Sequence, residues 1–294
     1  MRWTAAGLVA LIALGGAGWV LTAPDGQLAA VAEGPPGDPG NGALVFAAAG
    51  CASCHVAPDT EAGEAPVLAG GRAFVSGFGT FYAPNISPSP QGVGDWSDEQ
   101  IVQAVMRGVS PTGAHYYPAL PYTAYALADP QDMRDMVAHL RTLPPSPEEN
   151  RPNEVGFPFS IRRTLGAWKL MNMPDGWAVP GDLSEAETRG RYLVEALGHC
   201  GACHTPRGPL GGLDRDRWLV GAPNPSGDGR IPDITPSGLD WSENEIAYYL
   251  ETGFTPEFDT AGGEMAVVVR ELAKLPAADR AAIAAYLKAV PPAE

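Results

Sequence analysis

The distribution of apolar and polar positions divides the chain into an apolar beginning and a longer part of alternating helical and loop segments. An almost unbroken apolar run extends from Ala5 to Ala23, and Arg2 is the only charged residue among residues 1–23. Residues 24–40 are rich in proline and glycine and are expected to form a flexible spacer. After the spacer, stretches with apolar residues at helical spacing alternate with long loops, which predicts a mainly α fold.

The apolar run within residues 1–23 permits two interpretations. A secretory signal would be cleaved at a small-residue site such as Ala30-Val31-Ala32. An uncleaved membrane anchor would need about 20 apolar residues to span a bilayer, which the run nearly supplies. We favour the anchor, because the run is longer than the apolar part of most signals and the Ala-x-Ala site lies well beyond it. Either segment would export the rest of the chain from the cytoplasm.

An internal repeat organises the rest of the chain. Matching segments recur at separations of 145 to 148 residues: Asn85–Pro88 with Asp233–Pro236, Asp95–Ile101 with Asp240–Ile246, Gly108 with Gly253, and Leu143–Pro145 with Val290–Pro292. A nearly constant offset indicates two copies of one structural unit. We therefore predict a first copy over residues 41–145, a connector over residues 146–183, and a second copy over residues 184–294.

The two copies are expected to have the same order of helices. A leading helix, at about residues 42–49 in the first copy, precedes a long loop, a short helix and a closing helix. Ser97 and Ser242 begin the short helices, because a serine followed by acidic residues is typical of a helix N-terminus. Ser184 and Glu187 form a capping box for the second leading helix. The apolar stripes of the closing helices are Met133, Met136, Val137 and Leu140, and Ile283, Tyr286 and Leu287.

The connector contains an extended segment and a helix. Residues 150–159 are expected to be extended and residues 161–171 to be helical. The predicted helix carries a small basic cluster, Arg162, Arg163 and Lys169. We interpret this region as a packed link between the copies; the alternative is that the cluster contacts an acidic group.

Composition narrows the classes of function. The 294 residues carry a formal net charge of -15, which argues against nucleic acid as a partner, because such binding needs a basic surface. The 36 glycines and 30 prolines predict many loops. All four cysteines fall in two motifs, Cys51-Ala52-Ser53-Cys54-His55 and Cys200-Gly201-Ala202-Cys203-His204, so we expect no structural disulfide.

The two cysteine motifs have the spacing of c-type haem attachment sites. Each thiol would add to one vinyl group of a haem, and the adjacent histidine would ligate the iron. A thioredoxin-like dithiol or a zinc site also uses Cys-x-x-Cys, but the histidine after both pairs and the lack of a βαβ pattern favour haem. We predict two covalently attached haem c groups. The predicted attachment residues are Cys51, Cys54, Cys200 and Cys203, and the predicted proximal ligands are His55 and His204.

The sixth position of each iron determines whether it only exchanges electrons or also binds a substrate. Met265 lies 61 residues after His204, is the only methionine after the second motif, and is predicted to ligate the second iron. The residue 145 positions before Met265 is Leu120, which cannot ligate iron. His115, in the same loop, is then a candidate sixth ligand of the first iron. The alternatives are a five-coordinate iron or one of three methionines, Met106, Met133 and Met136.

These motifs resemble those of bacterial dihaem class I cytochromes c, over about residues 41–292. The segments that carry the resemblance are the doubled Cys-x-x-Cys-His, Pro84–Pro88, Gly94–Ser97, Tyr117–Tyr122 and Gly262–Met265. The chain is similar to the cytochrome subunits of membrane-bound alcohol, gluconate and sorbitol dehydrogenases, although those usually carry three haem domains. In that family the loop at Tyr117–Tyr122 often presents a methionine at the position of Leu120.

The resemblance implies a function in electron transfer. The chain would accept electrons from a dehydrogenase on the periplasmic side of the membrane and pass them to a quinone or a terminal oxidase. The alternative is a haem enzyme, similar to a thiosulfate dehydrogenase or a dihaem peroxidase, in which the first haem is the catalytic centre. A third interpretation is a haem module that only assembles a larger complex. The sequence contains no nucleophile motif, phosphate-binding loop or cluster of non-haem metal ligands, and this favours the electron carrier.

Overall fold

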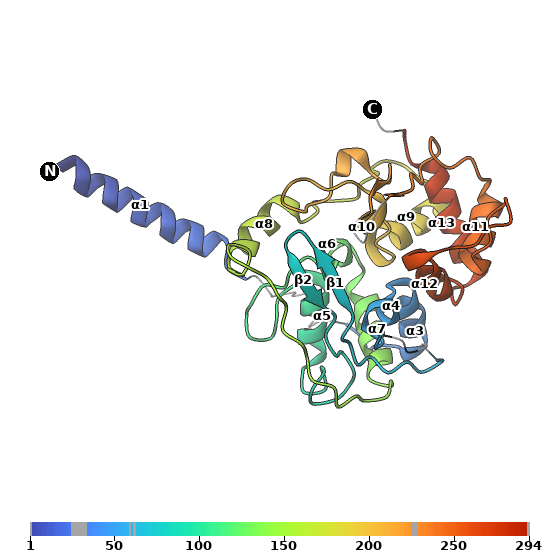
Figure 1. The fold of residues 1–294 in the computed structure, drawn as a ribbon, viewed down its shortest axis with the longest axis horizontal. Helices are drawn as coiled ribbons and strands as arrows, with labels where there is room; N and C mark the ends of the chain where they lie inside the picture. The colour runs from blue at the N-terminus through green and yellow to red at the C-terminus, as the bar shows by residue number, and fades with distance from the viewer. Residues whose placement is uncertain (1, 25–33, 59, 61–62, 225–228, 293–294) are drawn as a thin grey trace.

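The computed structural model describes residues 2–24, 34–58, 60, 63–224 and 229–292, and the candidate cleavage site Ala30-Val31-Ala32 lies outside them. The elements are α1 (Arg2–Leu21), α3 (Pro39–Ala48), α4 (Cys51–His55), β1 (Ala73–Ser76), β2 (Gly79–Tyr82), α5 (Asp98–Arg107), α6 (Tyr122–Tyr125), α7 (Pro130–Leu140), α8 (Thr164–Asn172), α9 (Glu185–Arg191), the π-helix η1 (Tyr192–Leu197), α10 (Gly201–His204), the 3-10 helix η2 (Arg215–Arg217), β3 (Ala222–Pro223), β4 (Arg230–Ile231), α11 (Glu243–Thr252), α12 (Gly263–Leu272) and α13 (Ala277–Ala289). The fold is mainly helical, as predicted (Figure 1).

The leading helix of each copy packs against the closing helix of the same copy, α3 on α7 and α9 on α13. A glycine lies at each crossing point. A Cβ atom on Gly42 would overlap the carbonyl oxygen of Asp135, and one on Gly190 would overlap the carbonyl oxygen of Ala282. The two backbones can approach this closely only because glycine has no side chain. The same crossing in both copies supports the internal repeat.

The predicted helix starts are confirmed. Ser97, Ser184 and Ser242 each accept a hydrogen bond from the backbone N–H three residues later, and the side chain of that later residue accepts one from the serine N–H. These reciprocal bonds satisfy donors that the first turn of a helix leaves unpaired. α5 and α11 then end at Gly108 and Gly253, both in the left-handed conformation.

Several boundaries differ from the sequence-based expectation. α3 begins at Pro39, where Asp38 accepts a hydrogen bond from the Gly40 N–H, so the expected spacer ends earlier than residue 40. In the connector, α8 begins at Thr164 rather than at residue 161, and residues 157–160 form turns rather than an extended strand. Two short antiparallel hairpins, β1 with β2 and β3 with β4, were not predicted. Their strands are too short for an alternating pattern to identify them.

The apolar N-terminal run forms α1, which extends away from the rest of the fold (Figure 1). Its C-terminal end packs on the connector: the Arg163 guanidinium lies 4.3 Å from the Trp19 ring centroid and donates to the Trp19 carbonyl oxygen. Sequence analysis favoured a membrane anchor for this segment. Among the residues that the structure describes, no helix has the length and apolar character needed to cross a bilayer.

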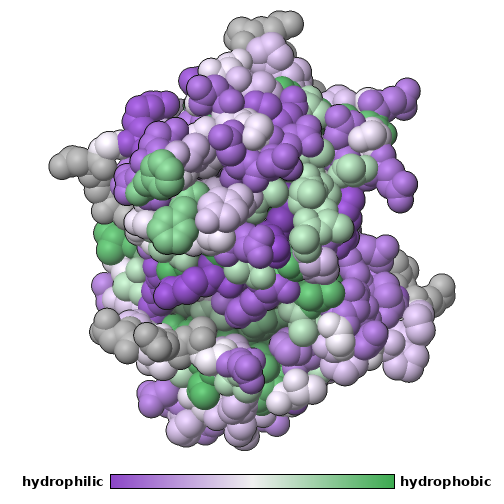
Figure 2. All heavy atoms as spheres, turned by 90° about the vertical axis from the view of Figure 1, so that its right-hand side faces the viewer, coloured by the Kyte–Doolittle hydropathy of each residue, from purple (hydrophilic) through white to green (hydrophobic). Residues whose placement is uncertain are grey.

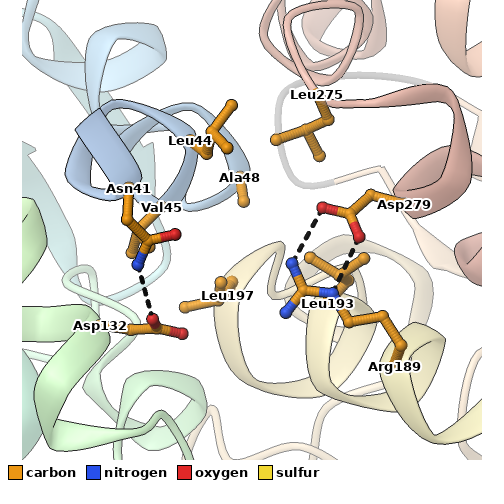
Figure 3. Close-up of a pocket in the computed structure, with 10 residues that line it drawn as sticks. All are labelled: Asn41, Leu44, Val45, Ala48, Asp132, Arg189, Leu193, Leu197, Leu275 and Asp279. Atoms are coloured by element: carbon orange, nitrogen blue, oxygen red, sulfur yellow. Dashed lines mark hydrogen bonds and ion pairs between the residues drawn. The ribbon is translucent and has the colours of Figure 1, made fainter.

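The two copies contact each other through their leading helices. Apolar side chains from both copies line a small pocket at this contact: Leu44, Val45 and Ala48 of α3, Leu193 and Leu197 of η1, and Leu275 (Figure 3). Asn41 donates to Asp132 at the edge of the pocket, and the Tyr192 hydroxyl, from the second copy, donates to the same carboxylate at 2.5 Å. An apolar contact with polar pairs at its edge therefore holds the copies together.

The outer face of the second copy is mainly hydrophilic. Figure 2 shows polar residues over most of the face that includes α11 and α13, with hydrophobic residues in small separate groups. This agrees with the acidic composition of the chain. The haem motifs lie instead on the inner side of each copy, near the contact between the copies (Figure 1).

Candidate haem sites

Both predicted attachment motifs lie on single-turn helices. α4 contains Cys51 to His55 and follows Gly50, which has a φ of 63°. α10 follows Cys200, and the residue before that cysteine, His199, has a φ of 40°. The chain therefore turns sharply just before each pair of cysteines, and in the second copy it does so at the end of the π-helix η1.

The four cysteines of the two motifs are not joined by disulfides, and Cys203 is exposed whereas the other three are half-buried. Burial of the sulfur atoms, with a smaller effect of the second cysteine of each motif, raises the pKa of Cys51 and of Cys200 to about 12. The spacing of the paired cysteines on one helical turn suits the two vinyl groups of a haem.

The two predicted proximal histidines have the same environment. Nδ1 of His55 lies 2.8 Å from the carbonyl oxygen of Pro84, and Nδ1 of His204 lies 2.8 Å from that of Pro232. A carbonyl only accepts, so Nδ1 donates and Nε2 keeps the lone pair that can ligate iron. Burial lowers the pKa of both imidazoles, and the hydrogen bond to the carbonyl partly offsets this. Each imidazole is therefore neutral at pH 7, and its hydrogen bond to the carbonyl oxygen fixes the orientation of the ring.

The loop that leaves each motif returns to it in the same way. Gly70 donates its N–H to the carbonyl oxygen of His55 at 2.7 Å, and Gly221 donates to that of His204 at 2.8 Å. Further along, Ile86 donates to Leu68 and Ile234 donates to Leu219, each at 3.0 Å. The matching bonds show that the two sites are built by the same backbone arrangement.

Met265, the predicted sixth ligand of the second iron, lies on α12. It is the third residue of that helix, is half-buried, and packs against the core. α12 contacts α11 of its own copy and also α3 and α4 of the first copy. The helix that carries Met265 thus touches the first attachment motif. The role of Met265 as a ligand stays a prediction.

Equivalent backbone bridges align the distal loops of the two copies. Val109 pairs with His115 in the first copy, and Phe254 pairs with Thr260 in the second. This register makes His115 equivalent to Thr260 and Leu120 equivalent to Met265. Leu120 is half-buried and lies just before α6, a four-residue helix, where the second copy has the ten-residue α12. The first copy therefore differs from the second both in the ligand residue and in the helix that carries it.

His115 has another partner in this structure. Its side chain is buried, and Nε2 lies 3.1 Å from the carbonyl oxygen of Thr22, just after α1. Nδ1 is buried without a hydrogen-bond partner. Burial lowers the pKa of this imidazole, so the ring is neutral at pH 7. For His115 to ligate the first iron through Nε2, the contact with Thr22 would have to break; its role stays a prediction.

The three methionines considered as alternatives are all in the core. Met106, Met133 and Met136 are each no more than 4% exposed. Met133 and Met136 lie on α7, the closing helix, as the apolar stripe predicted. Their ligation of the first iron is likewise untested.

The residues present fit a c-type haem in both copies. Each site combines two thiols on one helical turn with an imidazole whose Nδ1 is held by a backbone carbonyl. In the second copy, half-buried apolar and aromatic side chains pack against the core: Trp218, Ile234, Trp241, Tyr249 and Met265. Such a donor set with apolar surroundings is what covalently bound haem requires.

Comparison with known proteins agrees with this geometry. The family model described as Cytochrome c matches residues 40–144 and again residues 187–291. A dihaem cytochrome c-type protein of Cereibacter sphaeroides is 51% identical over 294 residues, which cover 100% of this chain and 99% of that protein. The resemblance inferred from the motifs is therefore confirmed.

Two further relatives are subunits of dehydrogenases. The fructose dehydrogenase cytochrome subunit of Gluconobacter japonicus is 38% identical over 252 residues, or 83% of this chain and 51% of the subunit. The cytochrome c subunit of the quinone-dependent alcohol dehydrogenase of Gluconobacter oxydans is 32% identical over 264 residues, or 82% of this chain and 52% of the subunit. The chain spans about half the length of these subunits. It belongs to the cytochrome c family, as a dihaem protein with two cytochrome c domains.

Proposed function

We propose that this protein carries single electrons between a dehydrogenase on the periplasmic side of the membrane and the respiratory chain. Relatives that are cytochrome subunits of fructose and alcohol dehydrogenases support a dehydrogenase as the electron donor. The acceptor would be a quinone or a terminal oxidase. The acidic net charge would favour partner surfaces that are basic.

The proposal assigns a role to each site residue. Cys51 and Cys54 would hold the first haem, and Cys200 and Cys203 would hold the second. When bound, haem c supplies reversible one-electron exchange. The carbonyl oxygens of Pro84 and Pro232 orient the two imidazoles through Nδ1 and leave Nε2 free to ligate iron.

The distal residues complete this assignment. Met265 would supply a thioether to the second haem, which would raise its reduction potential. In the first copy, His115 could take the same position only by giving up its contact with Thr22, and the structure keeps that contact. A nitrogen ligand there would lower the first potential relative to the second.

The observation that carries the proposal is the contact that joins the segments just before the two attachment motifs. The Tyr125 ring, from the first copy, packs edge to face against the His199 ring, next to Cys200, with centroids 5.8 Å apart. The Tyr125 hydroxyl donates at 2.9 Å to the carbonyl oxygen of Ala49, two residues before Cys51. A short, packed route therefore runs from one motif to the other. Electron exchange between two cofactors requires such proximity.

One observation favours the second candidate function, a haem enzyme. Leu120 occupies the position equivalent to Met265, so this position cannot supply a thioether to the first haem. An iron with an open sixth position could bind peroxide or a thiosulfate sulfur. In that case the second haem would supply or remove electrons.

Membranes from a strain that lacks the gene provide the test. We expect them to oxidise the donor substrate with ferricyanide as acceptor but to lose substrate-dependent oxygen uptake. Alcohol, fructose, gluconate and nicotinate, the substrates named for relatives, form the first panel. Wild-type protein should restore oxygen uptake, and a Cys203→Ala variant, which lacks one thioether bond, should restore less.

The haem-enzyme function predicts different results for the deletion strain and for the purified protein. Unchanged oxygen uptake in the deletion strain for every substrate of the panel would contradict the carrier function. Steady turnover of hydrogen peroxide or thiosulfate by the purified protein, lost on changing His55 but not Met265, would instead support the haem enzyme.

A further inference from the structure

Arg72 connects the two haem sites through hydrogen bonds at both ends of its guanidinium group. One nitrogen donates at 2.5 Å to the carbonyl oxygen of Ser53, inside the first attachment motif. The other donates at 2.6 Å to both carboxylate oxygens of Glu264, which is 192 residues away in the second copy. Glu264 immediately precedes Met265. One side chain therefore links the first motif to the predicted ligand segment of the second iron.

The ion pair lies where the second copy packs on the first attachment motif. α12, which begins at Gly263, packs on α4 at this place.

The exposure of the pair is uneven. The Arg72 side chain is 26% exposed and the Glu264 side chain 61%. An exposed ion pair alone stabilises a protein by at most about 1 kcal/mol, so stability does not account for this arrangement well. A guanidinium group that donates to a different partner from each of two nitrogens, however, restrains geometry more than a single charge does.

We propose that Arg72 is a positioning residue that couples the two haem sites, because it holds Glu264 and the start of α12, and with them Met265, against the first attachment motif. The inference deepens the proposed function and rests on its ligation of the second iron by Met265. The pair also places one positive and one negative charge between the first attachment motif and the start of α12. Removal of either side chain leaves the other charge uncompensated there.

The sign of the electrostatic effect follows from the charge that an electron adds to the iron. A nearby carboxylate opposes this addition and lowers the reduction potential, whereas a guanidinium raises it. Arg72→Gln should therefore lower the potentials of both haems, and Glu264→Gln should raise them. For the second haem we expect roughly a tenfold change in the reduction equilibrium, or about 59 mV for a one-electron couple.

A change in the position of Met265 has its own spectroscopic signature. Ferric haem with a methionine ligand has a weak charge-transfer band at the red end of the visible spectrum, and this band is lost when the sulfur leaves the iron. We expect Arg72→Gln to weaken the band or to lower the pH at which it disappears as alkali is added. The double variant Arg72→Glu with Glu264→Arg should restore the band, because the pair is re-formed in the opposite order.

The chain offers a closely matched control. Arg141 pairs with Asp98 at 3.0 Å within the first copy, and the two side chains are 27% and 61% exposed, nearly the same as Arg72 and Glu264. Asp98→Asn removes a carboxylate of equal exposure without touching the contact between the copies. It should leave the methionine band and the second potential unchanged.

Measurements use the full-length haem-loaded protein and redox titration followed by absorbance, so no electron donor or acceptor protein is needed. The inference would be overturned if Arg72→Gln and Glu264→Gln left both the band and the second potential unchanged, or if the reversed pair restored neither. A wild-type protein without the methionine band would overturn it together with the ligation by Met265. Failure of the proposed carrier function appears separately, as unchanged oxygen uptake in the deletion strain.

Discussion

The ring nitrogen Nε2 of His115 lies 3.1 Å from the carbonyl oxygen of Thr22, which joins the loop of the first haem site to the end of α1. The two residues are 93 positions apart in the chain. Lys169, Arg163 and Arg162 also act electrostatically on this imidazole, and all three lie in the connector. The distal loop of the first copy is therefore packed into the junction between α1 and α8.

This contact leads to a test of the first iron's sixth ligand. We expect His115→Ala to leave the electron paramagnetic resonance spectrum of the oxidised first haem unchanged, because Nε2 is engaged by Thr22. His139→Ala is the control, since His139 packs against Phe46 on the other side of the copy. Loss of a low-spin signal in His115→Ala alone would establish His115 as the ligand and contradict the expectation.

Leu120 and Met265 occupy equivalent positions, so replacing each with the other's residue type tests how the two irons are ligated. Met265→Leu should lower the potential of the second haem, on the order of 0.1 V within the range of about 0.8 V that axial ligands cover. Leu120→Met should raise the potential of the first haem if the loop can bring sulfur to the iron. Redox titration of the two single variants checks both. A Met265→Leu protein with an unchanged second potential would show that Met265 is not a ligand.

The crossing of α9 and α13 predicts a strong steric effect. Gly190→Ala would force its Cβ against the carbonyl oxygen of Ala282 and push the helices apart. We expect a loss of about 3 kcal/mol in the free energy of unfolding, typical of an overpacked core site. Gly156→Ala is the matched control, because nothing lies within 4 Å of its added Cβ. Denaturant unfolding measures both, and equal midpoints would contradict the close crossing.

Lys169 predicts a pH dependence of stability. Its Nζ donates to the carbonyl oxygens of Arg107 and Gly108 at 2.5 and 2.8 Å, and lies 4.6 Å from the Tyr122 ring centroid. Burial, with a smaller effect of Arg107, lowers the pKa of this amine from 10.5 to about 8. Between these two pH values the unfolded chain holds a proton that the folded chain has released. The free energy of unfolding should therefore rise with pH across this window.

A neutral replacement isolates the contribution of Lys169. Lys169→Met should remove the rise, so that the difference in unfolding free energy between wild type and variant grows as the pH increases from about 8 to 10.5. Urea unfolding at several pH values measures this difference. Parallel curves for the two proteins would mean that Lys169 keeps an ordinary pKa in the fold.

Much of the architecture could be predicted because its signals are local. A Cys-x-x-Cys-His motif places its three reactive groups within five residues, so the pattern itself defines the chemistry. The serines at residues 97, 184 and 242 cap helices through side chains only three residues away. The repeat then extends each inference from one copy to the other. Short hairpins such as β1 with β2 left no such signal, since strands of four residues show too little alternation.

The sequence by itself determined the two haem motifs, the repeat and the substitution of leucine at the position of Met265. Only the tertiary structure decided which residues meet between the copies: Tyr125 with His199, Arg72 with Glu264, and His115 with Thr22. These pairs are 74 to 192 residues apart, and each depends on how complete helices and loops pack. Adjacent residues are brought together by covalent geometry alone, whereas distant ones meet only after the whole chain has folded.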